Sequence, residues 1–263
     1  FVHPFDDLDI VAGQGSIAME IVQELPTVDY ILAPVGGGGL ITGVSTLAKM
    51  LNPKIKVIGV EPAAAPSMTM ALASGEPVTL DSANTIADGT AVKRVGDRIF
   101  EYAKKNIDQM LTVEDDELVG AFLDMVENHK MIVENSGLLT VAALKQLDLK
   151  GKKAVAILSG GNMDVITMSS IVQHGLIQRD RIFSASVLLP DKPGQLALVA
   201  QTIADAQGNV IKLEHNQFVS TNRNAAVELR ITMEAYGTEH KNQIMKALEE
   251  KGFRPREIGA KLY

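Results

Sequence analysis

Short apolar runs alternate with helix-like segments through the first part of the chain. Apolar runs that predict buried strands cover residues 28–35, 55–60 and 153–158. Helices are predicted over residues 40–51, 118–129 and 137–147. Strands that alternate with helices predict an α/β fold with a doubly wound, mostly parallel sheet. In such a sheet, ligands bind at the carboxyl ends of the strands.

The pattern changes near residues 175–180, and a second domain is predicted beyond them. Its expected elements are a strand at 183–189, a helix from 196 to near 208, strands from 211 and over 225–233, a helix at 238–251 and a strand at 253–258. The order is βαββαβ, which predicts a ferredoxin-like sandwich. We therefore expect a first domain over 1–174, a linker over 175–180 and a second domain over 181–263.

Four consecutive glycines, Gly36, Gly37, Gly38 and Gly39, separate the first predicted strand from its helix. Each glycine costs roughly 0.5–1 kcal/mol of conformational entropy relative to alanine. Four in a row therefore indicate that the loop requires a backbone without side chains. Bare backbone N–H groups at a helix N-terminus can converge on an anion, and phosphate is the natural guest. A tight strand-to-helix turn without a ligand is the alternative.

A second polar loop follows the strand predicted at 153–158. Its residues are Ser159, Gly160, Gly161 and Asn162. At the carboxyl end of a parallel strand, the Ser159 hydroxyl would face the same crevice as the glycine run. There it could hydrogen-bond a neutral ring nitrogen, or it could simply begin a helix as an N-cap.

Composition narrows the function. Hydrophobic residues make up 46% of the 263 positions, which is ordinary for a globular protein with a substantial core. The net charge of −7 argues against a nucleic-acid surface. No apolar run approaches the length of a membrane helix and no signal peptide is evident, so we expect a cytoplasmic protein with no membrane partner. There are no cysteines, and the five histidines lack metal-ligand spacing. Demanding chemistry would therefore need an organic cofactor.

Six motifs together resemble the fold-type II pyridoxal-phosphate (PLP) enzymes, specifically the threonine dehydratases. They are His3-Pro4-Phe5-Asp6-Asp7, Gly13-Gln14-Gly15-Ser16, Pro34-Val35-Gly36-Gly37-Gly38-Gly39-Leu40, Gly59-Val60-Glu61-Pro62, Asp88-Gly89 with Ala91-Val92-Lys93-Arg94, and Ser159-Gly160-Gly161-Asn162. The resemblance covers Phe1 to about His174. It implies that Gly36 to Gly39 and Leu40 hold the PLP phosphate and that Ser159 meets the pyridine nitrogen.

The resemblance also implies two features that this sequence lacks. The family's Schiff-base lysine lies in a Ser-Phe-Lys-type motif, and its Ser-x-Gly-Asn loop grips the substrate carboxylate; neither occurs here. Lys49, Lys54, Lys56 and Lys93 are expected to be surface lysines. Because the sequence opens at Phe1 without a methionine, we expect these features upstream. No catalytic residue is assigned in this chain, which alone should be inactive.

Two further carboxylates have open roles. Related enzymes carry a cation site that maps here to Glu61, Ala65 and Ser67, and serine in place of a carboxylate makes a divalent ion doubtful and favours at most a monovalent one. Glu134 matches a family glutamate near the cofactor. We interpret it first as a helix-start carboxylate and second as a site residue.

The second domain resembles an ACT domain, through Leu189-Pro190-Asp191-Lys192-Pro193-Gly194-Gln195-Leu196 and Gly208-Asn209-Val210. The resemblance implies amino-acid binding at an interface between two such domains. Helix-terminal N–H groups near Gly194, Gln195 and Leu196 would take the carboxylate, and Asp191 or Asn209 the ammonium. A structural pairing module without a ligand is the alternative.

The reading that follows is β-elimination of L-threonine to 2-oxobutanoate and ammonia, in isoleucine synthesis or threonine catabolism. Isoleucine or valine would act as effector through the ACT domain, and the enzyme would be a homo-oligomer, a tetramer or a dimer. Serine is an expected second substrate, so a serine dehydratase or racemase is the alternative within the class. A non-catalytic amino-acid-sensing fragment is the alternative outside it.

Overall fold

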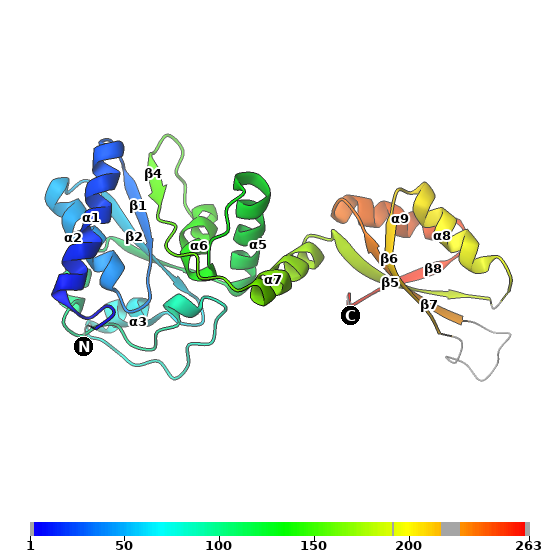
Figure 1. Cartoon of the computed structure of the whole chain (residues 1–263), viewed down its shortest axis with the longest axis horizontal. Helices are drawn as coiled ribbons and strands as arrows, with labels where there is room; N and C mark the ends of the chain where they lie inside the picture. Colours follow the sequence, from blue (N-terminus) through cyan, green and yellow to red (C-terminus); the bar gives the residue numbers. More distant parts are fainter. Residues whose placement is uncertain (1–2, 191, 217–226, 261–263) are drawn as a thin grey trace. The chain divides into compact units, whose positions relative to one another are not determined.

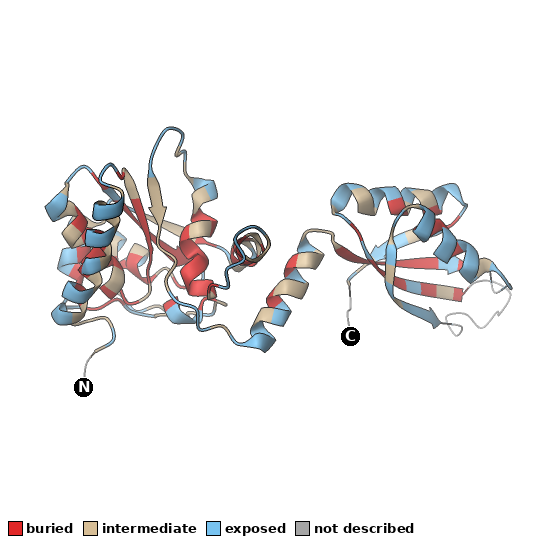
Figure 2. Ribbon diagram, turned by 45° about the horizontal axis from the view of Figure 1, so that its top comes forward, coloured by how far each residue is buried: buried red, intermediate tan, exposed pale blue. Residues whose placement is uncertain are grey.

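The computed structural model describes residues 3–190, 192–216 and 227–260. The chain divides into two compact units, Phe1–Ile171 and Val172–Tyr263, which are described separately below. In both units the buried residues lie on the central strands and on the helices packed against them (Figure 2).

The first unit contains a four-stranded sheet in which every neighbouring pair is parallel. The strands, in spatial order, are β3 (Gln109–Val113), β2 (Lys56–Pro62), β1 (Tyr30–Pro34) and β4 (Ala154–Ala156). The predicted parallel α/β sheet is confirmed. Strand β3 was not predicted, because its sequence QMLTV is short and mixes polar with apolar residues. Strand β4 is shorter than the predicted 153–158.

Helices cover both faces of this sheet (Figure 1). One layer holds α1 (Leu8–Glu24), α2 (Gly39–Leu51) and α4 (Phe100–Asn106), and the other holds α5 (Asp115–Asp124) and α6 (Asn135–Ala143). A short helix, α3 (Ser67–Ser74), follows β2. Because helices lie on both sides, β1 and β2 are almost wholly buried and read as continuous apolar runs.

Local sequence explains where several helices begin. Helix α5 begins with a capping box, in which the Glu114 and Glu117 side chains each accept a backbone N–H of the other's residue. It continues through a π-helical turn, Met125–His129, so the predicted helix over 118–129 is present in two forms. The predicted helix at 137–147 begins two residues earlier and ends in the 3₁₀ turn Leu144–Gln146.

The second unit has the predicted βαββαβ order. Its elements are β5 (Ile182–Leu189), α8 (Gln195–Asp205), β6 (Asn209–Asn216), β7 (Val227–Glu234), α9 (Thr238–Glu250) and β8 (Arg254–Ile258). The strands form an antiparallel sheet in the order β6-β7-β5-β8. Both helices lie on one face of the sheet (Figure 1). The apolar core lies between the helices and the sheet.

Most of the predicted linker over 175–180 is helical. Helix α7 runs from Val165 to Gln178, so residues 175–178 are helical. The change of pattern seen in the sequence reflects the step from helix to strand at Asp180, which has a φ of 53°. A polar composition alone could not separate a helix end from a linker.

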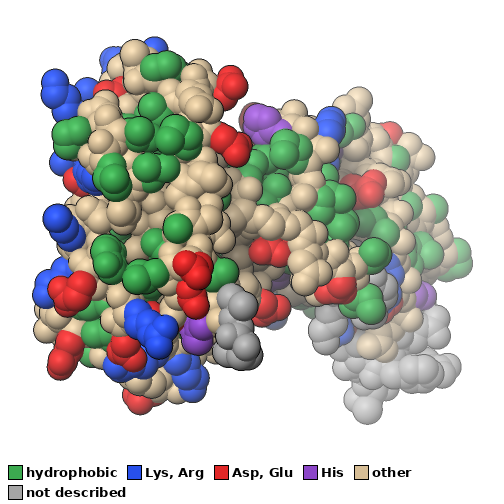
Figure 3. Space-filling model, turned by 60° about the vertical axis from the view of Figure 1, so that its left-hand side comes forward, with side chains coloured by type: hydrophobic (Ala, Val, Ile, Leu, Met, Phe, Trp, Pro, Cys, Tyr) green, Lys and Arg blue, Asp and Glu red, His purple; other side chains and the backbone are tan. Residues whose placement is uncertain are grey.

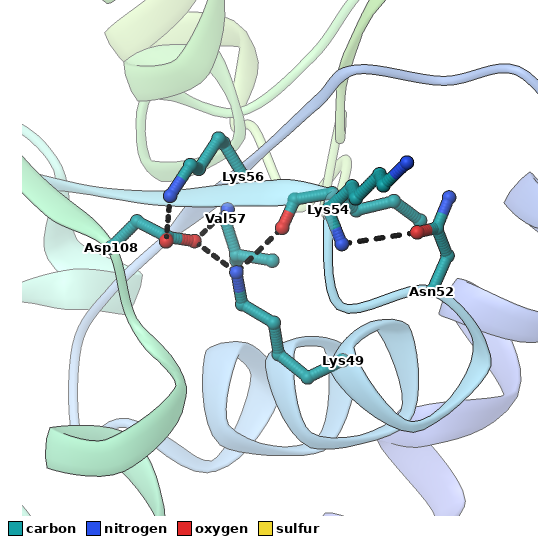
Figure 4. Close-up of polar contacts among 7 residues, drawn as sticks. Lys49, Asn52, Lys54, Lys56, Val57 and Asp108 are labelled. Atoms are coloured by element: carbon teal, nitrogen blue, oxygen red, sulfur yellow. Dashed lines mark hydrogen bonds and ion pairs between the residues drawn. The ribbon is translucent and has the colours of Figure 1, made fainter.

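A carboxylate joins three elements at the amino-terminal edge of the first sheet (Figure 4). Asp108 accepts hydrogen bonds from Lys49 Nζ at 2.6 Å, Lys56 Nζ at 2.9 Å and the Val57 N–H at 2.7 Å. Lys49 Nζ also donates to the Ile55 carbonyl. Burial alone would raise the pKa of Asp108, but the hydrogen bonds from Lys49, Val57 and Lys56 outweigh burial and lower this pKa. The side chain is 19% exposed.

We expect Asp108→Asn to lower the free energy of unfolding by about 1–3 kcal/mol at pH 7, the range for a lost charge-assisted hydrogen bond. A carboxyl whose pKa is lower in the folded state stabilises the fold above its unfolded pKa, and this contribution disappears as the pH falls through the folded value. In urea titrations from pH 7 to pH 3, the difference in unfolding free energy between wild type and Asp108→Asn should decrease.

The matched control for this prediction is Asp97→Asn, because the ion pair between Asp97 and Arg94 is on the surface, with the Asp97 side chain 66% exposed. Its effect should be within about 0.5 kcal/mol. The role of Asp108 would be contradicted if the loss of unfolding free energy in Asp108→Asn did not depend on pH, or if both variants lost the same amount.

The surface of the first unit mixes charges of both signs. Figure 3 shows apolar side chains gathered in groups on the visible face, with Lys, Arg, Asp and Glu interspersed below them. This face therefore presents no extended potential of one sign. Within the described ranges, no helix is both long and apolar enough to cross a membrane.

Candidate functional site

The two glycine motifs lie at the same edge of the first sheet. In the parallel pairing of β1 with β4, Leu32 is opposite Ala156, and the Ile157 N–H donates to the Leu32 carbonyl. Val35 comes three residues after Leu32, and Ser159 comes three residues after Ala156. The Gly36–Gly39 loop and the Ser159–Asn162 loop therefore leave adjacent strands at their carboxyl ends, as predicted.

The glycine loop offers a row of unused hydrogen-bond donors. Gly37, Gly38 and Gly39 are buried, and α2 begins at Gly39. Among the described residues, none accepts a hydrogen bond from the backbone N–H groups of residues 36–41. The first N–H groups of a helix have no intrahelical acceptor, and buried donors without partners are rare in folded proteins. The row fits an anionic group placed at the helix N-terminus.

Each glycine of the loop is also tightly enclosed. A Cβ atom on Gly37 would overlap the Phe5 ring, and one on Gly39 would lie 2.9 Å from the Phe5 carbonyl oxygen. Gly38 has a φ of 100°, and its Cβ would lie 2.8 Å from Met68 Cε. Close packing alone therefore requires glycine at these positions, in addition to any binding role of the free N–H groups. Close packing and free N–H groups therefore occur together in this loop.

A turn that contains Gly89 and Thr90 packs against the glycine loop. Gly36 packs against the turn that contains Gly89 and Thr90, since a Cβ on Gly36 would lie 3.1 Å from Thr90 Cα. Thr90 Oγ1 in turn donates to Ser136 Oγ at 3.4 Å. The turn was noted in the sequence only as part of a motif. Nothing in its spacing indicated that it would lie between the two loops.

Glu134 points to the Ser159–Asn162 loop. Its carboxylate accepts the Asn162 N–H at 3.0 Å and fills the space beside Gly160, where a Cβ would overlap it. Although Glu134 is at the N-cap position of α6, its side chain makes no capping bond. Glu134 therefore lies at a helix start, as one interpretation expected, but its side chain bonds to the Ser159–Asn162 loop instead of capping the helix.

Two polar groups near this carboxylate have no protein partner. The Ser159 hydroxyl is half-buried and makes no hydrogen bond with the described residues. Asn135 Oδ1 is buried without a partner in the same part of the chain, while its Nδ2 donates to the Ile86 carbonyl. A small cavity of about 60 Å³ lies here, with Asp88, Glu134 and Asn135 among its lining residues. Nothing in the sequence indicated Asn135, because an unsatisfied atom is a property of packing.

Glu61 has a structural explanation that does not involve a cation. It is fully buried, and its carboxylate accepts the Met68 N–H at 2.6 Å and the Thr69 N–H at 2.9 Å, at the start of α3. Burial raises the pKa of Glu61 against the opposing hydrogen bonds. The Ala65 carbonyl accepts the Ser67 N–H. Among the described residues, no three His, Cys, Asp or Glu side chains are grouped as for a metal ion.

Three of the four lysines considered in the sequence have their amines bonded to other groups. Lys49 and Lys56 both bond to Asp108, at the opposite edge of the sheet, and Lys49 is half-buried rather than on the surface. Lys93 is exposed and donates to the Asp81 carbonyl, and Lys54 is exposed.

The residues predicted to bind an effector do not come together in one copy of the second unit. Gly194 is the N-cap of α8, followed by Gln195 and Leu196, beyond the end of β5. Asn209 is at the other end of the sheet, opposite Glu234, which itself pairs with Ile182 at the start of β5. The length of β5 separates the two groups by roughly 20 Å. Asp191 lies outside the described residues.

The fold and the row of free N–H groups define an α/β protein of the kind that binds an anionic ligand at the carboxyl ends of its strands. The chain belongs to the pyridoxal-phosphate-dependent enzyme family, whose model matches residues 1–160. PLP is the cofactor of this family.

The similar proteins are mainly enzymes named for threonine. An L-threonine ammonia-lyase of Thermotoga maritima is 38% identical over 260 residues, 98% of this chain and 65% of that protein. A processed threonine deaminase isoform 2 of Solanum lycopersicum is 38% identical with a TM-score of 0.62, over 65% of this chain and 51% of that one. A serine racemase of Dictyostelium discoideum is 40% identical with a TM-score of 0.58, over 62% and 54%. The chain therefore spans less than two thirds of the length of each.

Proposed function

We propose that this chain forms the phosphate-binding part of a PLP-dependent threonine ammonia-lyase. The observation that carries the proposal is the row of N–H groups at residues 36–41 that no described residue accepts. The Gly36–Gly39 N–H groups and that of Leu40 would hold the phosphate at the start of α2, where the helix dipole favours negative charge.

Ser159 would hold the other end of the cofactor. Its hydroxyl is free within the described part of the chain and follows the strand next to the glycine loop. A neutral hydroxyl leaves a pyridine nitrogen largely unprotonated, whereas a carboxylate would favour the protonated form. When bound, PLP supplies the electron-withdrawing group that elimination requires. Glu134 would orient the Ser159 loop through the Asn162 N–H rather than contact the reacting atoms.

The proposed reaction is β-elimination of L-threonine to 2-oxobutanoate and ammonia, and the names of the relatives support this substrate. The role in isoleucine synthesis or in threonine catabolism stays open. Serine chemistry is the second candidate, favoured by the likeness to a serine racemase. The test is turnover of threonine against serine once a Ser-Phe-Lys-containing segment of the family is supplied. A dehydratase should release 2-oxobutanoate from threonine, whereas a serine racemase should convert L-serine to D-serine and leave threonine unchanged.

We also propose that the second unit is an ACT domain that responds to an amino acid. Its βαββαβ order supports this, as does the turn before α8 with Gly194 in a left-handed conformation at φ 89°. Since Gln195 and Asn209 lie at opposite ends of one sheet, a shared effector site needs two copies side by side. Gel filtration coupled to light scattering should therefore give a dimer or a tetramer, and a monomer would contradict a shared site.

A further inference from the structure

The buried carboxylate of Glu61 holds the start of helix α3. Glu61 is the next-to-last residue of β2 and is fully buried. Its Oε1 accepts the Met68 N–H at 2.6 Å and the Ser67 hydroxyl at 3.4 Å. Its Oε2 accepts the Thr69 N–H at 2.9 Å and the Thr69 hydroxyl at 2.8 Å. With two donors on each oxygen, the carboxylate has about as many hydrogen bonds as it can accept.

Helix α3 depends on this carboxylate because its own N-cap residue is Pro66. A proline side chain cannot accept a hydrogen bond, and Pro66 makes no side-chain capping bond. The first N–H groups of a helix have no intrahelical acceptor. Glu61 therefore takes the place of an N-cap side chain for Met68 and Thr69, and it fixes the position of the Met68 backbone.

Met68 connects the start of α3 to the glycine loop. Its side chain is fully buried, and a Cβ on Gly38 would lie 2.8 Å from Met68 Cε and 2.9 Å from Ile99 Cδ1. Gly38 is the N-cap of α2, and its carbonyl accepts the N–H of Thr42 at 3.0 Å and the hydroxyl of Thr42 at 2.7 Å. A displacement of Met68 would therefore change the packing of the residue at which the row of free N–H groups turns into the helix.

The donors around Glu61 leave no place for a metal ion. A cation bound to this carboxylate would have to displace N–H groups that α3 holds in position, and their positive ends would repel it. The Ala65 carbonyl is also in use, because it accepts the Ser67 N–H. Glu61, Ala65 and Ser67 therefore do not fit the cation site to which they correspond in related enzymes, since hydrogen bonds already satisfy the carboxylate.

We infer that Glu61 is a positioning residue for the loop that binds the PLP phosphate, and that it acts through Met68 without a metal ion. The identity of the ligand rests on the proposed function. The coupling of Glu61 to Gly38 does not, because it is a matter of contacts within this chain.

Amide NMR of the PLP-free chain tests the coupling, and PLP titration of the same samples tests its effect on binding. Glu61→Gln replaces one acceptor oxygen by a donor, so it should shift the Gly38 and Gly39 resonances. It should also weaken PLP binding by about tenfold, the loss of roughly one hydrogen bond to the phosphate. Thr69→Val removes only the hydroxyl donor and should act in the same direction with a smaller effect, so a milder variant is at hand if Glu61→Gln does not fold.

A double-mutant cycle with Met68→Ala distinguishes positioning from simple stabilisation. Met68→Ala should also weaken PLP binding by about tenfold. If Glu61 acts through Met68, the double variant should lose about tenfold rather than the hundredfold expected of independent effects.

The matched control is Asp108→Asn, because Asp108 is also a carboxylate that accepts a backbone N–H, at the opposite edge of the sheet. It should destabilise the fold but leave PLP affinity and the Gly38 resonance unchanged. Addition of EDTA or of Mg²⁺ should not change the PLP affinity of the wild-type chain.

Four results would overturn the inference. They are unchanged Gly38 and Gly39 resonances in folded Glu61→Gln, a hundredfold loss in the double variant, an equal loss of PLP affinity in Asp108→Asn, and tighter PLP binding with Mg²⁺. A wild-type chain that binds no PLP would instead refute the proposed function, and the resonances of the PLP-free samples would still test the coupling.

Discussion

Replacing Gly37 by alanine is expected to weaken PLP binding by about ten- to hundredfold, because a displaced loop loses about 1.5–3 kcal/mol of hydrogen bonding to the charged phosphate. The added Cβ would overlap the Phe5 ring, so the loop or the residues around Phe5 must move. Overpacking of this kind also costs about 1–3 kcal/mol of stability. PLP binding is measured by fluorescence titration, and stability by urea unfolding of the same samples.

The control substitution is Gly13→Ala on α1, where a Cβ would meet nothing within 4 Å. It should leave PLP affinity unchanged and stabilise the helix by about 0.5–1 kcal/mol. Unchanged PLP affinity in Gly37→Ala, despite a folded protein, would show that the loop does not hold the phosphate.

The 263-residue chain alone is expected to release no 2-oxobutanoate from threonine above the rate with free PLP. Lys49 and Lys56 are tied to Asp108 and Lys93 to the Asp81 carbonyl, so none of these amines faces the glycine loop. Without a lysine beside the cofactor there is no positioned base for the Cα proton. A coupled dehydrogenase assay measures the product.

Free PLP at the same concentration is the control for background turnover. Borohydride reduction followed by mass spectrometry adds a second readout, and no lysine of the first unit should carry a PLP adduct in stoichiometric amount. Rapid threonine turnover, or a stoichiometric adduct at one of these lysines, would contradict the account.

Periodicity predicted the elements whose packing is simple. Strand β1 and helix α2 are continuous apolar or amphipathic segments, and both are close to their predicted bounds. Strand β3 and helix α3 were missed, because the five residues of the first and the eight of the second are too few for a period to show. Most of the predicted linker is helical, because α7 continues through Gly175 and Leu176 to Gln178.

The glycine loop could be predicted from the sequence, but the reason for each glycine could not. Four glycines after a buried strand indicate an anion site, whereas the overlap of Gly37 with Phe5 depends on a contact between residues far apart in the chain. The contacts of Glu134 could not be predicted for a similar reason. Its position at a helix start is visible in sequence, but the direction of its side chain toward Asn162 is not.

The central claim is that the N–H groups of the glycine loop bind the PLP phosphate, and amide NMR tests it most directly. On titration with PLP, the ¹⁵N–¹H resonances of Gly36 to Gly39 and Leu40 should shift, and inorganic phosphate should shift the same resonances in the same direction. The account would be contradicted if saturating PLP left these resonances unchanged while shifting others, or left the whole spectrum unchanged.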